Sequence, residues 1–212
     1  MYNRICKYYK KVGGSLKKVK MSTFLLFEPG VNPTRAQKQF AGHDFLYYDA
    51  QAFEADYEHI GESQYVKSVN DTNKLTVNER LLVEGDVVIS NSLQQAVIVS
   101  ASNVGKVLPI NFTKVKFDDD TLDKAYFMYL FNVSTDVKRQ KERELQGSGA
   151  IQRIKVSALG DIEIPFVSLA EQRKIGAVYL EALRLRSHLN KYGSLIEQFS
   201  NGVIERTLYR GE

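Results

Sequence analysis

The sequence has one cysteine, Cys6, only four prolines and no tryptophan. A single cysteine excludes an internal disulfide and a zinc site of several thiolates within the chain, which fits a reducing cytoplasm. No stretch approaches the ~18 consecutive apolar residues of a membrane span, and the short apolar run 21–27 lacks the cleavage pattern of a signal peptide. We therefore expect a cytoplasmic protein that needs no metal or other cofactor.

A strong overall charge is also lacking. The 29 lysines and arginines and the 25 aspartates and glutamates give a formal net charge of +4, which by itself does not identify a nucleic-acid-binding protein. The basic residues are nevertheless clustered, because residues 1–20 contain seven of them and no acid, and residues 138–155 contain six against two acids. Such segments are typical of phosphate-contacting surfaces and also of ordinary solvated faces.

Most of the chain has the pattern of a mixed α/β domain with short elements. Runs rich in valine and isoleucine between turn residues predict strands at 87–90, 96–100, 115–117 and 161–164. Helical spacing of apolar residues predicts a buried helix over 122–132, followed by a more polar helix over 134–145. The polar stretch 61–80 predicts a loop with one strand at most.

A long helix is expected to follow Pro165, which can neither donate to a sheet nor lie inside a helix. Ser168 and Glu171 match a capping box, and apolar residues then recur in steps of three and four. The heptad residues, which we assign to dimerisation, are Ile175, Val178, Ala182, Leu185, Leu189, Tyr192, Ile196, Phe199 and Val203. At ~1.5 Å per residue, a helix over 169–208 would be about 60 Å long, more than one such domain can cover.

Two alternatives remain for this helix. It could be an ordinary amphipathic helix that lies on its own domain, or it could break at Gly193, where residues 194–197 offer a second capping box. The heptad phase continues past Gly193 and favours one helix. The predicted class is thus α+β, with a mixed α/β domain over 1–165 and a coiled-coil-forming α-helix over 166–212.

Catalytic motifs are scarce in the sequence. It contains no G-x-S-x-G, P-loop or G-x-G-x-x-G motif, and His43, His59 and His188 lack the spacing of metal ligands. Asp136 and Lys138 resemble half of a nuclease D-x-K site, while the run of aspartates at 118–120 fits a solvated turn. We therefore expect a binding protein rather than an enzyme, and no catalytic residue or metal ligand is assigned.

Three polar loops, at 32–39, 90–95 and 146–153, are candidates for reading DNA. Glutamine and arginine can read purine edges, and glycines allow a backbone to approach a ligand closely. The candidates for base edges are Arg35, Gln94, Gln95, Gln152 and Arg153, with Asn91 and Ser148 in the same loops. The candidates for phosphates are Lys17, Lys18, Lys38, Lys138, Arg139 and Arg143. Each loop taken alone also fits plain turn chemistry.

Several stretches resemble the specificity (S) subunits of type I restriction-modification systems. The loop Gly147-Ser148-Gly149-Ala150-Ile151-Gln152-Arg153-Ile154 is similar to that family's "G-G-x-x-Q-x-x-I" loop. Residues 162–175 are similar to its "I-P-x-P-x-x-x-E-Q-x-x-I" strand-to-helix junction, which is the most specific match. Looser similarities occur at 19–35 and at 82–90, the latter to an "L-x-x-G-D-L-L-x-S" strand. Departures are Val167 in place of the second proline and Gly-Ser-Gly in place of Gly-Gly.

The resemblance implies a non-catalytic subunit in which a target recognition domain reads one half of a split double-stranded DNA site. It also implies a spacer helix that pairs with the helix of a second recognition domain, and docking of methyltransferase and endonuclease subunits. Only one copy of each part occurs in this chain, so we expect an isologous homodimer with antiparallel helices and a palindromic split site. The alternatives are a coiled-coil interaction protein with a basic face, an inactive truncated specificity fragment, or a cryptic nuclease.

Overall fold

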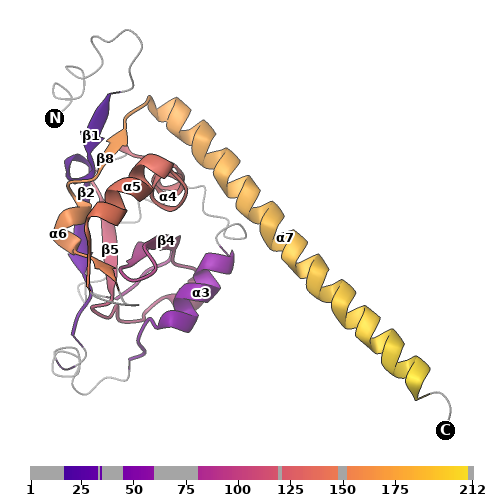
Figure 1. Ribbon diagram of the computed structural model, residues 1–212. Helices are drawn as coiled ribbons and strands as arrows, with labels where there is room; N and C mark the ends of the chain where they lie inside the picture. The colour runs from indigo at the N-terminus through magenta and orange to yellow at the C-terminus, as the bar shows by residue number, and fades with distance from the viewer. Residues whose placement is uncertain are drawn as a thin grey trace.

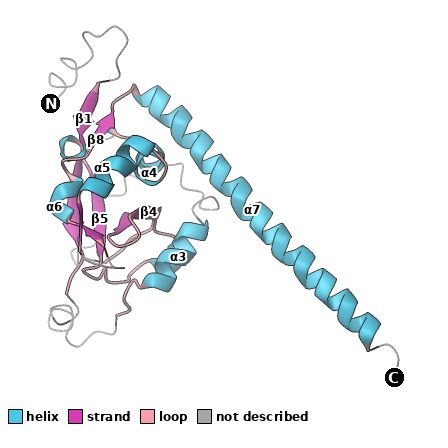
Figure 2. Ribbon diagram, viewed as in Figure 1, coloured by secondary structure: helices cyan, strands magenta, loops and turns pink. Residues whose placement is uncertain are grey.

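The computed structural model describes residues 17–32, 34, 45–59, 81–118, 121–147 and 152–209. A small α/β domain is followed by one long helix, so the predicted α+β class is confirmed (Figures 1 and 2). The strands are β1 Lys18–Lys20, β2 Leu25–Pro29, β3 Val87–Ser90, β4 Gln95–Ile98, β5 Phe112–Phe117, β6 Leu145–Gln146, β7 Arg153–Ile154 and β8 Glu163–Pro165. The helices are α3 Ala50–His59, α4 Lys124–Asn132, α5 Thr135–Arg143, α6 Val156–Leu159 and α7 Leu169–Leu208, with short 3₁₀ turns η1 Met21–Thr23 and η2 Ala101–Asn103.

A four-stranded antiparallel sheet in the order β2-β5-β3-β4 forms the centre of the domain. Strand β3 reads Val-Val-Ile-Ser and is buried along its whole length, as its apolar sequence requires. Helix α4 supplies the aromatic side of the core, where Phe127 and Phe131 stack at 5.6 Å between ring centroids. Two further pairs of strands, β1 with β8 and β6 with β7, lie outside this sheet.

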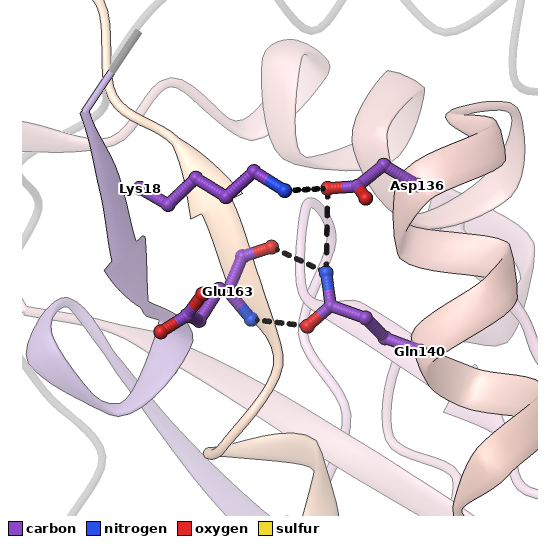
Figure 3. A network of polar contacts seen from close by, with 4 residues as sticks. All are labelled: Lys18, Asp136, Gln140 and Glu163. Atoms are coloured by element: carbon purple, nitrogen blue, oxygen red, sulfur yellow. Dashed lines mark hydrogen bonds and ion pairs between the residues drawn. The ribbon is translucent and has the colours of Figure 1, made fainter. Parts of the chain in front are cut away.

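Two side-chain amides close exposed strand edges. Asn132, the last residue of α4, pairs with the backbone of Ala96 on edge strand β4, through bonds of 2.8 Å and 2.9 Å. Gln140 of α5 pairs in the same way with Glu163 on β8, with two bonds of 2.8 Å (Figure 3). Each amide supplies both a donor and an acceptor to a strand residue whose backbone groups have, among the described residues, no partner strand on that side.

Helix α7 begins and ends where the sequence predicts. Ser168 accepts from the backbone nitrogen of Glu171 at 3.3 Å, and Glu171 accepts from that of Ser168 at 3.1 Å, which completes the capping box. The Ser168 hydroxyl also donates to the Glu171 carboxylate at 2.7 Å, and together with the Ser168 backbone N–H it lowers the pKa of the Glu171 carboxyl. The helix runs unbroken through Gly193, so the alternative of a break there is wrong.

The remaining elements differ from the sequence expectation in extent. The strand at 87–90 is confirmed, β5 begins three residues before the expected 115, and β8 begins two residues after the expected 161. Helix α3 was not expected, because its apolar residues are few; its buried Asp56 accepts from Tyr48 Oη at 2.7 Å and Asn103 Nδ2 at 2.8 Å. The predicted loop at 61–80 lies outside the described residues.

Candidate nucleic-acid interface

The turn of residues 90–95 between β3 and β4 is held in one conformation by several bonds. Gln94 has the only positive φ, 55°, among the described non-glycine residues, and its backbone nitrogen donates to Ser90 O at 2.8 Å. The Asn91 side chain is buried, accepting from Thr113 Oγ1 at 2.8 Å and donating to Ile110 O at 3.4 Å. Asn91 therefore supports the turn from inside, while Ser92 and Leu93 face the solvent.

Helix α5 packs against this turn through Lys141. The buried ammonium of Lys141 donates to Gln94 O at 2.7 Å and to Phe131 O at 2.6 Å, and it lies 4.2 Å from the centroid of the Phe131 ring. Burial, together with the charge of Lys138, lowers the pKa of Lys141 to about 8. Lys138, Arg139 and Arg143, which we expect to contact phosphates, are exposed on the rest of the helix.

The β6–β7 hairpin meets the same turn from another side. The backbone nitrogen of Ile154 donates to Asn91 O at 3.2 Å, so the end of β7 is attached to the turn. Gln152 and Arg153, two of the residues expected to read bases, are exposed beside this contact. The turn, α5 and the hairpin thus adjoin one another. We call their solvent-facing residues together the turn surface: Ser92, Leu93, Gln94, Gln95, Lys138, Arg139, Arg143, Gln152 and Arg153. At about 100° per residue, Arg139 and Arg143 lie on the face of α5 opposite Lys141.

Lys18 on β1 lies at the other end of α5. Its ammonium is 2.8 Å from Asp136 Oδ2, and both side chains are about half exposed, at 48% and 46% (Figure 3). Gln140 donates to the same carboxylate oxygen at 3.5 Å. The Asp136 carboxylate, the acid of the nuclease-like pair, is therefore engaged by Lys18 and Gln140, and a phosphate would compete with it for Lys18.

The remaining residues that we expect to contact DNA are only partly covered by the described structure. Arg35, Lys38 and Ser148 lie outside the described residues, so the 32–39 loop is represented by Asn32 and Thr34 alone. Lys17 is exposed at the start of β1, beside Lys18. Of the sequence candidates, those on the adjoining turn, α5 and hairpin are Gln94, Gln95, Lys138, Arg139, Arg143, Gln152 and Arg153.

Two residues were missed from the sequence, Lys141 beneath the turn surface and Leu93 on it. Lys141 shares a helix face with Val137, four residues earlier, which is fully buried. That spacing is a signal that Lys141 points inward, although its charge suggests solvent. Leu93 is 61% exposed at the tip of the turn, and a lone leucine within a polar loop carries no such signal.

Helix α7 carries two separate stripes. The stripe of Gln172, Gly176, Tyr179 and Leu183 is buried against the domain, mainly against α4. The predicted heptad residues begin with Ile175, which is partly buried there, but from Val178 onward they are exposed, for example Leu185 at 62% and Phe199 at 74%. At about 100° per residue the exposed stripe lies about 120° around the helix from the buried one. The C-terminal part of α7 projects beyond the domain (Figure 1).

The buried stripe fits α4 closely. A Cβ on Gly176 would lie 2.8 Å from Ala125 Cβ and 2.9 Å from the backbone nitrogen of Tyr126. Gln172 accepts from Asp123 N at 2.9 Å and donates to Thr121 O at 3.2 Å. The glutamate and glutamine of the "E-Q" motif therefore have distinct tasks, since Glu171 caps the helix and Gln172 attaches it to α4.

Chemistry-bearing side chains do not gather elsewhere in the part of the chain that the structure describes. No group of three histidine, cysteine or acidic side chains is placed there to hold a metal ion. Across the same residues, every helix is too short or too polar to cross a membrane. The turn surface and the exposed stripe of α7 are therefore the features on which a functional argument rests.

No protein-family model matches the chain, and no curated protein does so either. Solved structures, in contrast, do match this chain. An HsdS subunit from Thermoanaerobacter tengcongensis aligns over 99% of this chain, with a TM-score of 0.51 and 16% sequence identity. A chain from a structure of the type I R-M system aligns over 96% of it, with a TM-score of 0.53 and 14% identity. The type I restriction-modification S subunit from M. genitalium aligns over 88% of it, with a TM-score of 0.50 and 17% identity. This chain spans 44–49% of the length of those chains. It therefore has the fold of one half of an S subunit of a type I restriction-modification system.

Proposed function

We propose that this chain is a DNA-reading specificity subunit of a type I restriction-modification system. In this proposal residues 1–165 are a target recognition domain that reads one half of a split double-stranded site. Residues 166–212 are the spacer and dimerisation helix. The chain performs no catalysis itself and works in the cytoplasm with a methyltransferase subunit, and also with a restriction subunit where one is present.

One observation carries the proposal: two parts of the chain remote in sequence, the 90–95 turn and residues 135–154, meet at the turn surface. It combines four cations, Lys138, Arg139, Arg143 and Arg153, with amides at Gln94, Gln95 and Gln152. Cations bind phosphates of any sequence, whereas amide and guanidinium groups can read base edges. A turn on a buried antiparallel sheet holds such groups more firmly than a free loop does.

The exposed stripe of α7 supports the dimeric part of the proposal. Seven of its apolar or aromatic side chains are at least 47% exposed: Val178, Leu185, Leu189, Tyr192, Ile196, Phe199 and Val203. An exposed apolar face of this length marks an interaction surface. A second copy of this chain offers the same stripe, and a two-fold antiparallel pairing would place two recognition domains at opposite ends. A palindromic split site follows from that arrangement.

Methylation mapping tests the proposal most directly. Genomic DNA from cells with the chain should carry a methylated split motif that is absent after the gene is deleted. The purified chain, with its methyltransferase subunit, should bind a duplex of that motif more tightly than a scrambled duplex. Its log affinity should also fall linearly with log salt, because phosphate contacts release counterions.

Other outcomes would favour the alternatives. Weak and equal binding to every duplex, with no methylated motif lost, would indicate an inactive fragment or a coiled-coil interaction protein. Metal-dependent cleavage by the purified chain, abolished by Asp136→Asn, would indicate the nuclease. We expect no cleavage, because the Asp136 carboxylate is engaged by Lys18 and Gln140.

A further inference from the structure

We propose that Lys141 is a positioning residue for DNA reading: its buried ammonium fixes the 90–95 turn so that Leu93 and Gln94 meet base edges. This inference rests on the proposed function. It assigns sequence discrimination, rather than affinity, to a lysine that DNA cannot reach.

Lys141 is placed to hold backbone rather than phosphate. The residue is 4% exposed, so its charge is not available to a ligand at the surface. Both hydrogen bonds of its ammonium end on backbone carbonyls, at Gln94 and Phe131. Phe131 O belongs to the last turn of α4, where carbonyls have no helical partner. Lys141 thus caps α4 and connects it to the turn in a single contact.

The turn needs such a contact because its backbone is strained. The φ of 55° at Gln94 lies in the left-handed region, which costs a residue with a Cβ about 1 kcal/mol or more. The carbonyl of the same residue receives the Lys141 ammonium, so the bond acts where the strain is. Loss of that bond would take the Lys141 donor from a half-buried carbonyl and let Gln94 relax toward negative φ.

The fixed turn presents an apolar side chain to solvent, and the elements attached to the turn carry exposed cations. Leu93 is 61% exposed at the tip, its backbone nitrogen held by Ser90 Oγ at 3.3 Å. Arg139 and Arg143 follow on α5, and Arg153 follows on the attached hairpin. An apolar side chain discriminates thymine by its methyl group, and a glutamine reads adenine. Both readings depend on side-chain position to within about 0.5 Å, which a loose turn does not provide.

The test compares Lys141→Met with Lys138→Met on the same helix. Each full-length chain, with its methyltransferase subunit, is titrated with a duplex of the mapped motif and with a scrambled duplex. Lys141→Met should lower the ratio of the two affinities at least about tenfold, since one good base contact is worth about 1–3 kcal/mol. Its affinity for the scrambled duplex and its salt slope should not change. Lys138→Met should weaken binding to both duplexes equally and reduce the salt slope by about 1.

The outcomes separate the inference from the proposed function. If the wild-type chain prefers no sequence, the proposed function fails. If it does prefer one and Lys141→Met keeps the ratio within about twofold, the inference is overturned and the function stands. A salt slope that falls in Lys141→Met would also overturn it, because that result would make Lys141 a phosphate contact.

Two further measurements distinguish a specific loss of sequence reading in Lys141→Met from a general loss of stability. Titrations are run well below the thermal midpoint of each variant, where circular dichroism shows a folded chain. Hydrogen exchange on the wild-type chain needs no variant: the backbone amide of Gln94, which donates to Ser90 O at 2.8 Å, should exchange as slowly as the amides of α5. A fast-exchanging Gln94 amide would contradict a preorganised turn.

Discussion

The two halves of α7 have similar apolar content and opposite surroundings. In the first half, Gly176, Tyr179 and Leu183 are buried against the chain's own domain. In the second half, Ile196, Phe199 and Val203 are 67%, 74% and 47% exposed. The first stripe is matched to α4 by small and polar residues, whereas the second is a plain heptad repeat. One helix thus carries an intramolecular contact and, about 120° around it, a surface suited to another helix.

The largest expected effect is on the exposed stripe. Leu185→Glu with Leu189→Glu should raise the dissociation constant of the proposed dimer at least about a hundredfold, because each buried leucine is worth about 1.5–3 kcal/mol and a two-fold interface counts each substitution twice. Sedimentation at micromolar concentration measures it. Asn190→Glu with Asn201→Glu, on the opposite face of the helix, is the matched control and should leave the dimer intact.

The same substitutions should not alter the domain. Its thermal midpoint, measured at a concentration where both chains are monomeric, should be unchanged, because Leu185 and Leu189 are about 60% exposed. A wild-type chain that sediments as a clean monomer of about 24 kDa would remove the dimeric part of the proposal and leave the exposed half without a function.

A smaller effect is expected at the docked half. Gly176→Ala places a Cβ 2.9 Å from the backbone nitrogen of Tyr126, which cannot move without distorting α4. Such overpacking costs about 1–3 kcal/mol in the free energy of unfolding. Urea denaturation of the monomer should show the loss. An unchanged midpoint would mean that α7 does not dock on α4 as the structure has it.

Alkaline pH should also weaken the docked half. Tyr126 Oη donates to Pro165 O at 2.9 Å near the start of α7, and burial raises the pKa of this phenol to about 12. The unfolded chain, with a tyrosine pKa near 10, releases the proton first, so the free energy of unfolding falls between about pH 10 and pH 12.

Tyr126→Phe isolates this contribution. The variant should lose about 0.5–1.5 kcal/mol at neutral pH through its missing hydrogen bond. The stability difference between wild type and variant should then shrink as the pH rises from 10 to 12, which thermal denaturation at several pH values can measure. A difference that stays constant over that range would show that Tyr126 is not the titrating group.

The contrast between the two halves of α7 also shows which structural features could be predicted from the sequence. A capping box and a heptad repeat are local signals, so the bounds of α7 and its exposed stripe could be predicted. The docked stripe could not be predicted, because Gln172 and Gly176 are not apolar. Gln172 is buried because it hydrogen-bonds to residues near α4, and Gly176 because a small residue fits closely against α4. Helix α3 was missed for a related reason, since its buried Asp56 depends on partners as distant as Asn103.

The candidate interface follows the same rule. Polar loops pointed to Gln94, Gln95 and Gln152, because loop composition is local. The inward direction of Asn91 and Lys141 depends on Thr113 and on the carbonyls of other elements, which no local pattern specifies. Local chemistry thus identified the segments of the surface, and tertiary contacts decided which side chains support it from inside.

The smallest expected effect is also the sharpest control for the two halves. Gly193 lies inside α7, and a Cβ there meets no atom within 4 Å, so Gly193→Ala adds no clash in the monomer. Because alanine favours a helix over glycine by about 1 kcal/mol, this variant should gain up to that much stability, opposite in sign to Gly176→Ala. Circular dichroism of the monomer during thermal denaturation measures both. Equal losses in the two variants would mean that the helix surroundings do not differ, and the contrast between its halves would fail.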